Sequence, residues 1–420
     1  MSQDPLHLIC IEPSFPGRLG AVADWLVRKR GYHCRFCCTR TEPPEFWPES
    51  TGKGLEVVLY NVGGVAREPS AAWTRVLERG LCYAYGCWEM LEARRLRPID
   101  LVLGRSGGQG STLFFPVFQP GVPIVNLFDY YLQAHSHDLA DEAGAEMPAE
   151  YFHWRRAANA MDLLDLENGV IPWTHTAWQR DLFPKEYRQD FLVHFDGVDS
   201  ARFDRVKNKA GDRVIQGRKI PAETRIVTFV ARNLEQLRGF DRFMELANRL
   251  ARHRSNVVCI VVGGFQVQRG LDVRFYGQDY HEHVFSRNPP HDPERFWFLG
   301  SVSPAAVAEV LKASDLHVYP SRSYVVSRSL VEAMAAGCVI LAADTVPVRE
   351  FITPGQTGIL VPFNDIDSWE SQAREVLDHP HTYQELGLAA ATKVRERFAQ
   401  DVTMPDLAKA FDIIVNGAKG

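Results

Sequence analysis

Short, nearly continuous apolar segments alternate with helical segments along the chain, and this alternation constrains the fold more than any other feature. In the first half the apolar segments include LHLICI (6–11), LEVVLY (55–60) and IDLVLG (99–104), and a helical segment covers residues 20–30. Strands that are apolar on both faces are typical of a parallel sheet with helices on both sides. The first half is therefore expected to be a Rossmann-like α/β domain.

A second alternating series follows a polar stretch, residues 207–223, that contains glycine and proline. Its expected strands share the same apolar pattern: 225–232, 257–264, 316–321 and 338–344. A chain of 420 residues is too long for one ordinary core. We expect an α/β fold of two doubly wound, Rossmann-like domains that face a central cleft. The expected boundaries are 1–207 and 208–395, with a C-terminal helix over 396–420 that packs back on the first domain.

Composition and charge limit the classes of function. Apolar residues make up 45% of the chain and charged residues 24%, as in ordinary globular proteins. The formal net charge is −5, which argues against nucleic acid as a partner, because nucleic-acid surfaces need clustered Lys and Arg. The first thirty residues lack a basic n-region and a cleavage site, and no segment reaches the ~20 apolar residues of a membrane-spanning helix. A cytoplasmic protein is expected.

Two sequence patterns suggest metal sites, and both have a better structural interpretation. The segment HCRFCCT (33–39) is not followed by a second Cys or His pair at zinc-site spacing, so a buried strand with reduced thiols is expected there. The segment DID (365–367) has the form D-x-D, but Asp367 with Glu370 is interpreted as the capping box of a helix. No metal and no other cofactor are expected.

Residues 316–344 carry the strongest functional signal. They predict a strand that ends near Pro320, a loop, a helix from about residue 327 to residue 336, and a further strand. The first N–H groups of such a helix and its dipole form an anion site, where a diphosphate can bind without metal. The hydroxyls of Ser327 and Ser329 and the cation of Arg328 are expected to contribute.

Three further charged residues are candidates for the same site. Glu332, in the second turn of that helix, can accept both hydrogen bonds of a ribose diol, or it can pair with a buried arginine. Arg232, at the end of an expected strand, and Arg238, just before Gly239, suit a pyrophosphate whose charge must be balanced as it leaves. Solvated surface arginines are the alternative.

Gly17 and Gly20 lie in the segment FPGRLG (15–20), between the first strand and the first helix. Glycine lets the backbone approach a phosphate or a sugar closely, although the pattern is not G-x-G-x-x-G. Gly17, Gly20 and the intervening Arg18 are therefore included in the expected donor site.

Several segments, in the expected order over nearly the whole chain, resemble glycosyltransferase family 4 enzymes of the two-domain GT-B fold. They are FPGRLG, HFDGVD (194–199), VARNLEQLRGF (230–240), VVGG (261–264), FWFLGSV (296–302), SDLHVYPSRS (314–323), and SLVEAMAAG (329–337) followed by VILAAD. The resemblance implies a retaining transfer, without metal, from a nucleotide-sugar held mainly by the second domain.

By position, the resemblance also assigns roles. It implies that Arg232 and Arg238 contact the diphosphate and that Glu332 binds the ribose. The backbone of the loop at Gly300, Ser301 and Val302 is expected to read the base.

One position departs from the family pattern. The family usually has a glutamate eight residues before the ribose-binding one, and this chain has Tyr324. The contacts to the sugar hydroxyls are therefore expected from Tyr324 and from the backbone of Val325, Val326 and Ser327.

A less studied branch of the family resembles this chain in NLFDYYLQAH (126–135), in HTAWQRDLFPKEYR (175–188) and in the Tyr at the altered position. Many relatives have a histidine in place of Asp129, so Asp129 can hold a sugar hydroxyl or assist proton movement. A turn or cap residue is the alternative. Three weaker candidates are expected in solvated polar loops: Arg105, His135 and His137.

The resulting hypothesis is a retaining glycosyltransferase with a UDP-sugar donor, or a GDP-sugar as the alternative, and a glycan, a lipid-linked molecule or a small molecule as acceptor. A sugar phosphorylase or hydrolase of the same fold and a nucleotide-sugar-binding sensor are the competing hypotheses. Two basic clusters, RKR (28–30) and RRLR (94–97), predict either peripheral contact with the inner face of a membrane or solvated helix ends.

Overall fold

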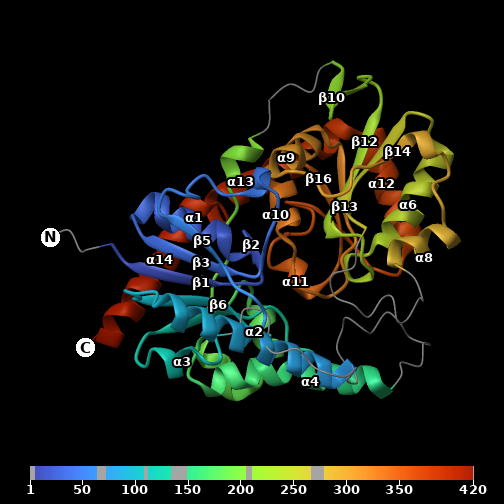
Figure 1. Ribbon diagram of the computed structural model, residues 1–420. Coiled ribbons are helices and arrows are strands. Elements are labelled where there is room, and N and C mark those ends of the chain that lie inside the picture. The colour runs from blue at the N-terminus through green and yellow to red at the C-terminus, as the bar shows by residue number, and fades with distance from the viewer. Residues whose placement is uncertain are drawn as a thin grey trace. The chain divides into compact units, whose positions relative to one another are not determined.

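The computed structural model describes residues 5–63, 72–107, 112–133, 149–204, 211–265 and 279–419. The chain divides into two compact units: unit 1 consists of Met1–Asp196 and Thr403–Gly420, and unit 2 of Gly197–Val402. Each unit is built on its own parallel sheet with helices on both faces (Figure 1). The expected α/β fold with two Rossmann-like domains is therefore confirmed.

Unit 1 contains a seven-stranded sheet in the order β5-β3-β1-β6-β7-β8-β9, and all neighbouring strands are parallel. The strands are β1 (His7–Ile11), β3 (His33–Cys38), β5 (Leu55–Leu59), β6 (Leu101–Arg105), β7 (Ile124–Leu127), β8 (Ile171–Thr174) and β9 (Leu192–Val193). The described helices are α1 (Leu19–Arg30), α2 (Ala72–Arg94), α3 (Phe115–Phe118), α4 (Ala149–Glu167), α5 (Ala177–Leu182) and α14 (Gln400–Lys419). Shorter elements are β2 (Ser14–Phe15), β4 (Arg40–Thr41) and the 3₁₀ helices η1 (Pro44–Phe46) and η3 (Lys185–Asp190).

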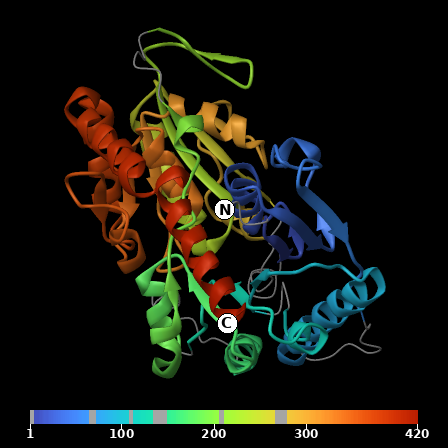
Figure 2. The ribbon, with the colours of Figure 1, turned by 90° about the vertical axis from the view of Figure 1, so that its left-hand side faces the viewer.

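The C-terminal helix α14 is part of the core of unit 1. Leu407 and Phe411 of α14 are fully buried in the same apolar cluster as Leu26 of α1 and Leu8 of β1. Phe411 meets Trp173 of β8 edge to face, with 6.2 Å between the ring centroids. Figure 2 shows α14 as the long red helix that ends at the C marker. On the opposite side of this sheet from α1, α2 packs against α4 (Figure 1).

Unit 2 contains a six-stranded sheet in the order β14-β13-β12-β15-β16-β17, again with parallel neighbours. The strands are β12 (Arg225–Asn233), β13 (Val257–Gly264), β14 (Phe296–Phe298), β15 (Leu316–Tyr319), β16 (Val339–Ala343) and β17 (Ile359–Val361), with a separate hairpin of β10 (Arg213–Ile215) and β11 (Arg218–Ile220). The described helices are α6 (Phe240–His253), α8 (Tyr280–Arg287), α9 (Pro304–Ala313), α10 (Arg328–Ala335), α11 (Val346–Arg349), α12 (Ile366–Asp378) and α13 (Pro380–Arg397). Short 3₁₀ helices are η4 (Ser200–Phe203), η5 (Gln236–Arg238) and η6 (Pro293–Arg295).

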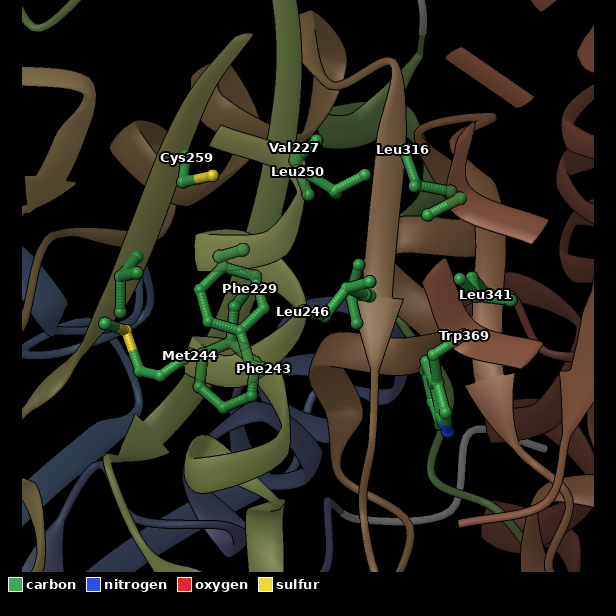
Figure 3. Close-up of a cluster of buried hydrophobic side chains, with 14 of the residues drawn as sticks. Val227, Phe229, Phe243, Met244, Leu246, Leu250, Cys259, Leu316, Leu341 and Trp369 are labelled. Atoms are coloured by element: carbon green, nitrogen blue, oxygen red, sulfur yellow. The ribbon is translucent and has the colours of Figure 1, made fainter. Parts of the chain in front are cut away.

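The core of unit 2 lies between its sheet and the helices α6 and α12 (Figure 3). Phe229 of β12 packs on Phe243 of α6, with 5.0 Å between the ring centroids, and Trp369 of α12 is fully buried. Burial of each such side chain contributes about 1.5–3 kcal/mol. The buried positions of α6 recur every three or four residues and so form one apolar stripe: Phe240, Phe243, Met244, Ala247 and Leu250. This packing holds β12 and the helix that follows it in a fixed relation.

The start of α12 differs from the expectation. Its N-cap is Asp365, whose carboxylate accepts hydrogen bonds from the backbone N–H of Ser368 at 3.1 Å and from the Ser368 hydroxyl at 2.6 Å. Asp367 already lies in the first turn, and Asp367 and Glu370 both pair with Arg249, at 2.7 and 3.0 Å. The predicted capping box of Asp367 and Glu370 is therefore wrong, because the carboxylate two residues earlier occupies the cap position.

The segment 33–38 is confirmed as a buried strand, β3, and Cys34, Cys37 and Cys38 are all buried. The Sγ atom of Cys34 lies 3.6 Å from that of Cys10, and burial raises the pKa of the Cys38 thiol to about 11. Within the described ranges no group of three or more His, Cys, Asp or Glu side chains is placed to hold a metal ion. No helix in those ranges is both long enough and apolar enough to cross a bilayer.

Candidate active site

The carboxyl ends of β12 and β15 lie side by side in the middle of the unit 2 sheet. The two strands pair in parallel with Val227 opposite Leu316, while β13 flanks β12 and β16 flanks β15. The order of strand addition reverses between β12 and β15. In open α/β sheets, ligands bind outside the carboxyl ends of the strands at such a switch point. This edge is the candidate donor site of unit 2.

The loops that follow β12 and β15 are joined by backbone contacts. The carbonyl oxygen of Leu237 accepts hydrogen bonds from the N–H of Arg322 at 3.1 Å and from the hydroxyl of Ser321 at 3.1 Å. Gly239 has a φ of +69°, and a side-chain carbon at this position would overlap the backbone of Pro320. Glycine is therefore required at residue 239 for the two loops to approach each other.

Arg238 and Tyr324 are in contact across these loops. The guanidinium of Arg238 donates a hydrogen bond from Nη1 to the carbonyl oxygen of Val325 at 2.7 Å. The central carbon of the guanidinium lies 5.4 Å from the centroid of the Tyr324 ring, and only 8% of Tyr324 is exposed. Arg232, next to the last residue of β12, is exposed. The two predicted cations thus lie on one edge of the sheet, and Arg238 is the one fixed against the loop of β15.

Helix α10 begins where the sequence predicted it. Its N-cap residue, Ser327, has an extended backbone and no side-chain cap hydrogen bond. The N–H of Ser327 donates to the hydroxyl of Tyr319 at 2.9 Å, and the hydroxyl oxygens of Ser327 and Ser329 lie 2.5 Å apart. Arg328 and Glu332 are half-buried in the first and second turns. An anion at this end would meet the first-turn N–H groups and the positive end of the helix dipole.

Val326 and the predicted base-reading loop lie at the same edge. Val326 is buried just before the N-cap of α10. The carbonyl of Gly300 accepts a hydrogen bond from the N–H of Gly263 at 3.0 Å, which ties the loop after β14 to the end of β13. Ser301 is exposed and Val302 is half-buried. This loop therefore lies beside β13, the strand next to β12.

In unit 1 the first turn of α1 already holds a carboxylate of the protein. Glu12, which follows β1 and is 1% exposed, accepts hydrogen bonds from the N–H groups of Arg18 at 2.8 Å and Leu19 at 3.0 Å. Gly17 has a φ of +54°, and a side-chain carbon there would overlap the Glu12 carboxylate. The N–H of Gly20 donates to the carbonyl of Pro16 at 2.8 Å. Gly17 is thus needed to admit the carboxylate to the helix terminus.

Asp129 is held between two arginines. Its carboxylate pairs with Nη1 of Arg18 at 3.0 Å and with Nε and Nη2 of Arg105, the Nε contact being 3.0 Å. Nη1 of Arg105 also donates to Glu12 at 3.1 Å. The backbone carbonyl of Asp129 accepts from Nε2 of Gln179 at 2.6 Å. Asp129 is therefore an ionised, oriented carboxylate at the carboxyl edge of the unit 1 sheet.

The expectation for Arg105 is wrong, because Arg105 does not lie in a solvated loop. It is the last residue of β6, and only 6% of it is exposed. Its position next to β1 in the sheet brings it to Glu12, and the buried Glu12 and the partly buried Asp129 pair with its charge. His135 and His137 lie outside the described residues.

A second buried group in unit 1 consists of Asp162 and Asp165 on α4. The hydroxyl oxygen of Ser106, which follows β6, lies 2.6 Å from Asp162 and 2.8 Å from Asp165. Serine has one hydroxyl proton to donate, so the second short contact requires a proton on a carboxyl group. Burial raises the pKa of Asp162 to about 8 and that of Asp165 to about 7. At least one of the two is a neutral carboxylic acid at neutral pH.

Sequence reasoning missed Glu12, Asp162 and Asp165, and it placed Arg105, a weaker candidate, in a solvated loop. Glu12 and Arg105 each stand at the carboxyl end of an expected strand, and this placement was a usable signal. It was not used because β1 and β6 become neighbours only in the folded sheet. Asp162 and Asp165 lie in a helix, where nothing in the sequence distinguishes them from solvated carboxylates.

The architecture of the two units is that of the GT-B fold. Two solved structures share the fold over almost the whole chain. A sucrose-phosphate synthase from Thermosynechococcus elongatus is 15% identical, with a TM-score of 0.72 over 99% of this chain and 100% of that one. The Anabaena protein HepE in complex with UDP-glucose is 14% identical, with a TM-score of 0.66 over 97% of this chain and 99% of that one.

Two family models match the chain, one in each half. The model described as "Glycosyl transferase family 4 group" matches residues 30–203, and that described as "Glycosyl transferases group 1" matches residues 212–393. The first half of the chain thus matches the family 4 group and the second half matches group 1, and both are families of glycosyltransferases. A D-inositol 3-phosphate glycosyltransferase from Gordonia bronchialis is 30% identical over 236 residues, which are 52% of this chain and 49% of that protein. The match thus spans about half the length of that curated relative.

Proposed function

We propose that the chain is a retaining glycosyltransferase that moves a sugar from a nucleoside diphosphate to an acceptor without a metal ion. The observation that carries this proposal is the meeting of Arg238, Arg232 and the N-terminus of α10 at the carboxyl ends of β12 and β15. A diphosphate carries the charge that two guanidinium groups and a helix N-terminus bind. The same groups stabilise the additional charge that develops as the diphosphate leaves.

The remaining donor contacts follow from the arrangement of unit 2. Ser327, Arg328 and Ser329 bind the diphosphate, and Glu332 accepts the hydrogen bonds of the ribose diol. The loop at Ser301 and Val302 contacts the base. A UDP-sugar is the proposed donor, supported by the UDP-glucose complex of the structural neighbour HepE, and a GDP-sugar is the alternative.

Unit 1 is the proposed acceptor domain. Asp129, kept ionised and oriented by Arg18 and Arg105, accepts a hydrogen bond from a sugar hydroxyl. Gly17 and Gly20 shape the loop that carries Arg18. The acceptor is a glycan, a lipid-linked molecule or a small molecule, and D-inositol 3-phosphate is the first to test because a curated relative is named for it.

Binding and turnover together test the proposal. Isothermal titration of the full chain with UDP and GDP should show binding of one of them without added metal. Incubation with the corresponding nucleotide-sugars should release the diphosphate only when an acceptor is present. Binding without release under any condition would support a sensor, and release that requires only water or phosphate would support a hydrolase or a phosphorylase.

Two further readings test the finer parts of the proposal. The anomeric configuration of the product, determined by NMR, should match that of the donor. Added EDTA should leave the rate unchanged, because Arg232 and Arg238 supply the positive charge. An inverted product would contradict the retaining assignment, and loss of activity in EDTA would contradict the metal-independent one.

A further inference from the structure

Tyr324 contacts the proposed diphosphate-binding cation directly. The ring of Tyr324 lies under the guanidinium of Arg238, with 5.4 Å from the guanidinium carbon to the ring centroid. The next residue, Val325, accepts the hydrogen bond from Nη1 of Arg238 at 2.7 Å. Two consecutive residues of one loop, one through its ring and one through its carbonyl oxygen, therefore contact the same guanidinium.

The backbones of the two loops are also fixed to each other, so this contact does not depend on side chains alone. Leu237, the residue before Arg238, accepts hydrogen bonds from both Ser321 and Arg322. Gly239, the residue after it, packs directly on the backbone of Pro320. Arg238 is thus carried by a segment that is anchored on both sides to the loop of Tyr324.

We propose that Tyr324 is a positioning residue that orients the Arg238 guanidinium toward the diphosphate, so that it acts on the leaving group and not on the transferred sugar. This inference rests on the proposed function. An aromatic ring covers only the flat face of a guanidinium, and all five N–H donors lie along its edge. The stacked arrangement therefore restrains the arginine while its donors stay directed along the edge.

The identity of residue 324 sets the charge of the site. A carboxylate in contact with the guanidinium would pair with it and neutralise it. A tyrosine ring attracts the cation through its quadrupole and leaves the full positive charge in place. Tyr324 thus gives Arg238 a rigid position without reducing its attraction for a diphosphate.

The test compares diphosphates with monophosphates in matched variants. In Tyr324→Leu, titration should show about tenfold weaker binding of UDP or GDP, because the stacking contact is lost. UMP and GMP should bind as they do to the unchanged chain, because they lack the β-phosphate. Tyr324→Phe keeps the ring and removes the hydroxyl, and it should restore diphosphate affinity to within about twofold.

A double-mutant cycle tests whether the effect passes through Arg238. In an Arg238→Ala background, Tyr324→Leu should cause no further loss of diphosphate affinity. Arg238→Lys keeps the charge without the planar group, and it should also weaken UDP or GDP binding about tenfold. This variant gives an answer even if Tyr324→Leu does not fold.

Several outcomes would overturn the inference. Unchanged diphosphate affinity in Tyr324→Leu or in Arg238→Lys would show that the stack does not orient the cation. A change in sugar preference in Tyr324→Phe, with intact diphosphate binding, would place the hydroxyl on the sugar. If the unchanged chain bound neither UDP nor GDP, the proposed function would fail as well, which separates that failure from the others.

Discussion

The two units have the same strand arrangement around their switch points, but the charged side chains at that position differ. In unit 1 the carboxyl ends of β1 and β6 carry Glu12 and Arg105, which pair with each other, and Glu12 also takes the first N–H groups of α1. In unit 2 the corresponding ends of β12 and β15 carry arginines and hydroxyls, and the N-cap of α10 has no side-chain cap hydrogen bond. The same fold position therefore holds an internal charge pair in unit 1 and, in unit 2, cations that suit the proposed diphosphate.

The difference has an energetic meaning. The network Glu12–Arg105–Asp129 is sensitive to loss of Arg105, because the buried Glu12 carboxylate and the Asp129 carboxylate then lose the cation that they share. Arg232 is exposed and Arg238 is half-buried, so substitution of either should cost less stability than substitution of Arg105. Substitution of a charged residue at the switch point should therefore lower the stability of unit 1, whereas in unit 2 it should mainly weaken ligand binding.

The largest expected effect is on the stability of unit 1. Arg105→Ala should lower the free energy of unfolding by about 3–5 kcal/mol, because the buried carboxylate of Glu12 and the partly buried carboxylate of Asp129 lose their shared cation. Urea denaturation followed by tryptophan fluorescence measures this, since Trp173 is buried in the same unit. The triple variant Arg105→Met, Glu12→Gln, Asp129→Asn should regain part of the loss. An unchanged unfolding midpoint in Arg105→Ala would show that the network does not stabilise the unit.

The next effect is on catalysis in unit 2. Arg232→Ala and Glu332→Ala should each lower kcat/KM by about 10²–10³-fold, because each removes an interaction with the leaving nucleotide. Their unfolding curves should stay within about 1 kcal/mol of the unchanged chain. Arg249→Ala is the matched control, since Arg249 pairs with Asp367 and Glu370 on the outer helices. Retained activity in both site variants would refute the donor-site assignment.

A pH-dependent effect is expected from the buried acids of unit 1. Burial raises the pKa of Asp162 from 3.8 to about 8, so between these values the folded chain binds a proton that the unfolded chain releases. The free energy of unfolding should therefore fall as the pH rises from about 4 to about 8, by up to about 1.4 kcal/mol per pH unit for one group. Asp162→Asn should flatten this slope, and the exposed Asp181→Asn should not. Equal slopes in all three proteins would contradict a protonated Asp162.

The opposite dependence is expected from the core of unit 2. His317 is fully buried beside Thr228, and burial lowers its pKa from 6.5 to about 3. The unfolded chain then binds the proton that the folded chain excludes, so the free energy of unfolding should fall as the pH drops from about 6.5 to about 3. Thermal denaturation at pH 4 and pH 7 should show a smaller difference for His317→Gln than for His253→Gln, an exposed control. If the two variants responded alike, the neutral state of His317 would not contribute.

Much of the fold could be predicted from local pattern. The strand at 33–38, the helix that starts beside Ser327 and the parallel order of each sheet follow from apolar runs and their spacing, which depend on neighbours in the sequence. The cap of α12 was misassigned by two residues. Asp365 and Asp367 have the same side chain and lie two residues apart, so only the backbone geometry shows which carboxylate faces the first N–H groups.

The candidate site divides in the same way. The positions of Arg232 and Arg238 beside the end of β12, and of Glu332 in the second turn of α10, could be predicted from the local pattern, and their roles stay predictions. The burial of Arg105 and the proton held by Asp162 and Asp165 could not be predicted, since both result from strands and helices far apart in the chain coming together. Long-range burial changes the pKa and the partner of a side chain without changing its sequence context.

The sequence by itself determined the class: two α/β units, a helix N-terminus preceded by a loop rich in hydroxyls, and cations at strand ends. Tertiary structure decided what those groups face. In the folded chain the first N–H groups of α1 donate to Glu12, and the Tyr324 ring lies against the Arg238 guanidinium. The physical reason is that the apolar pattern encodes which surface of an element is buried, whereas pairing between charges depends on distances that exist only after the sheets have formed.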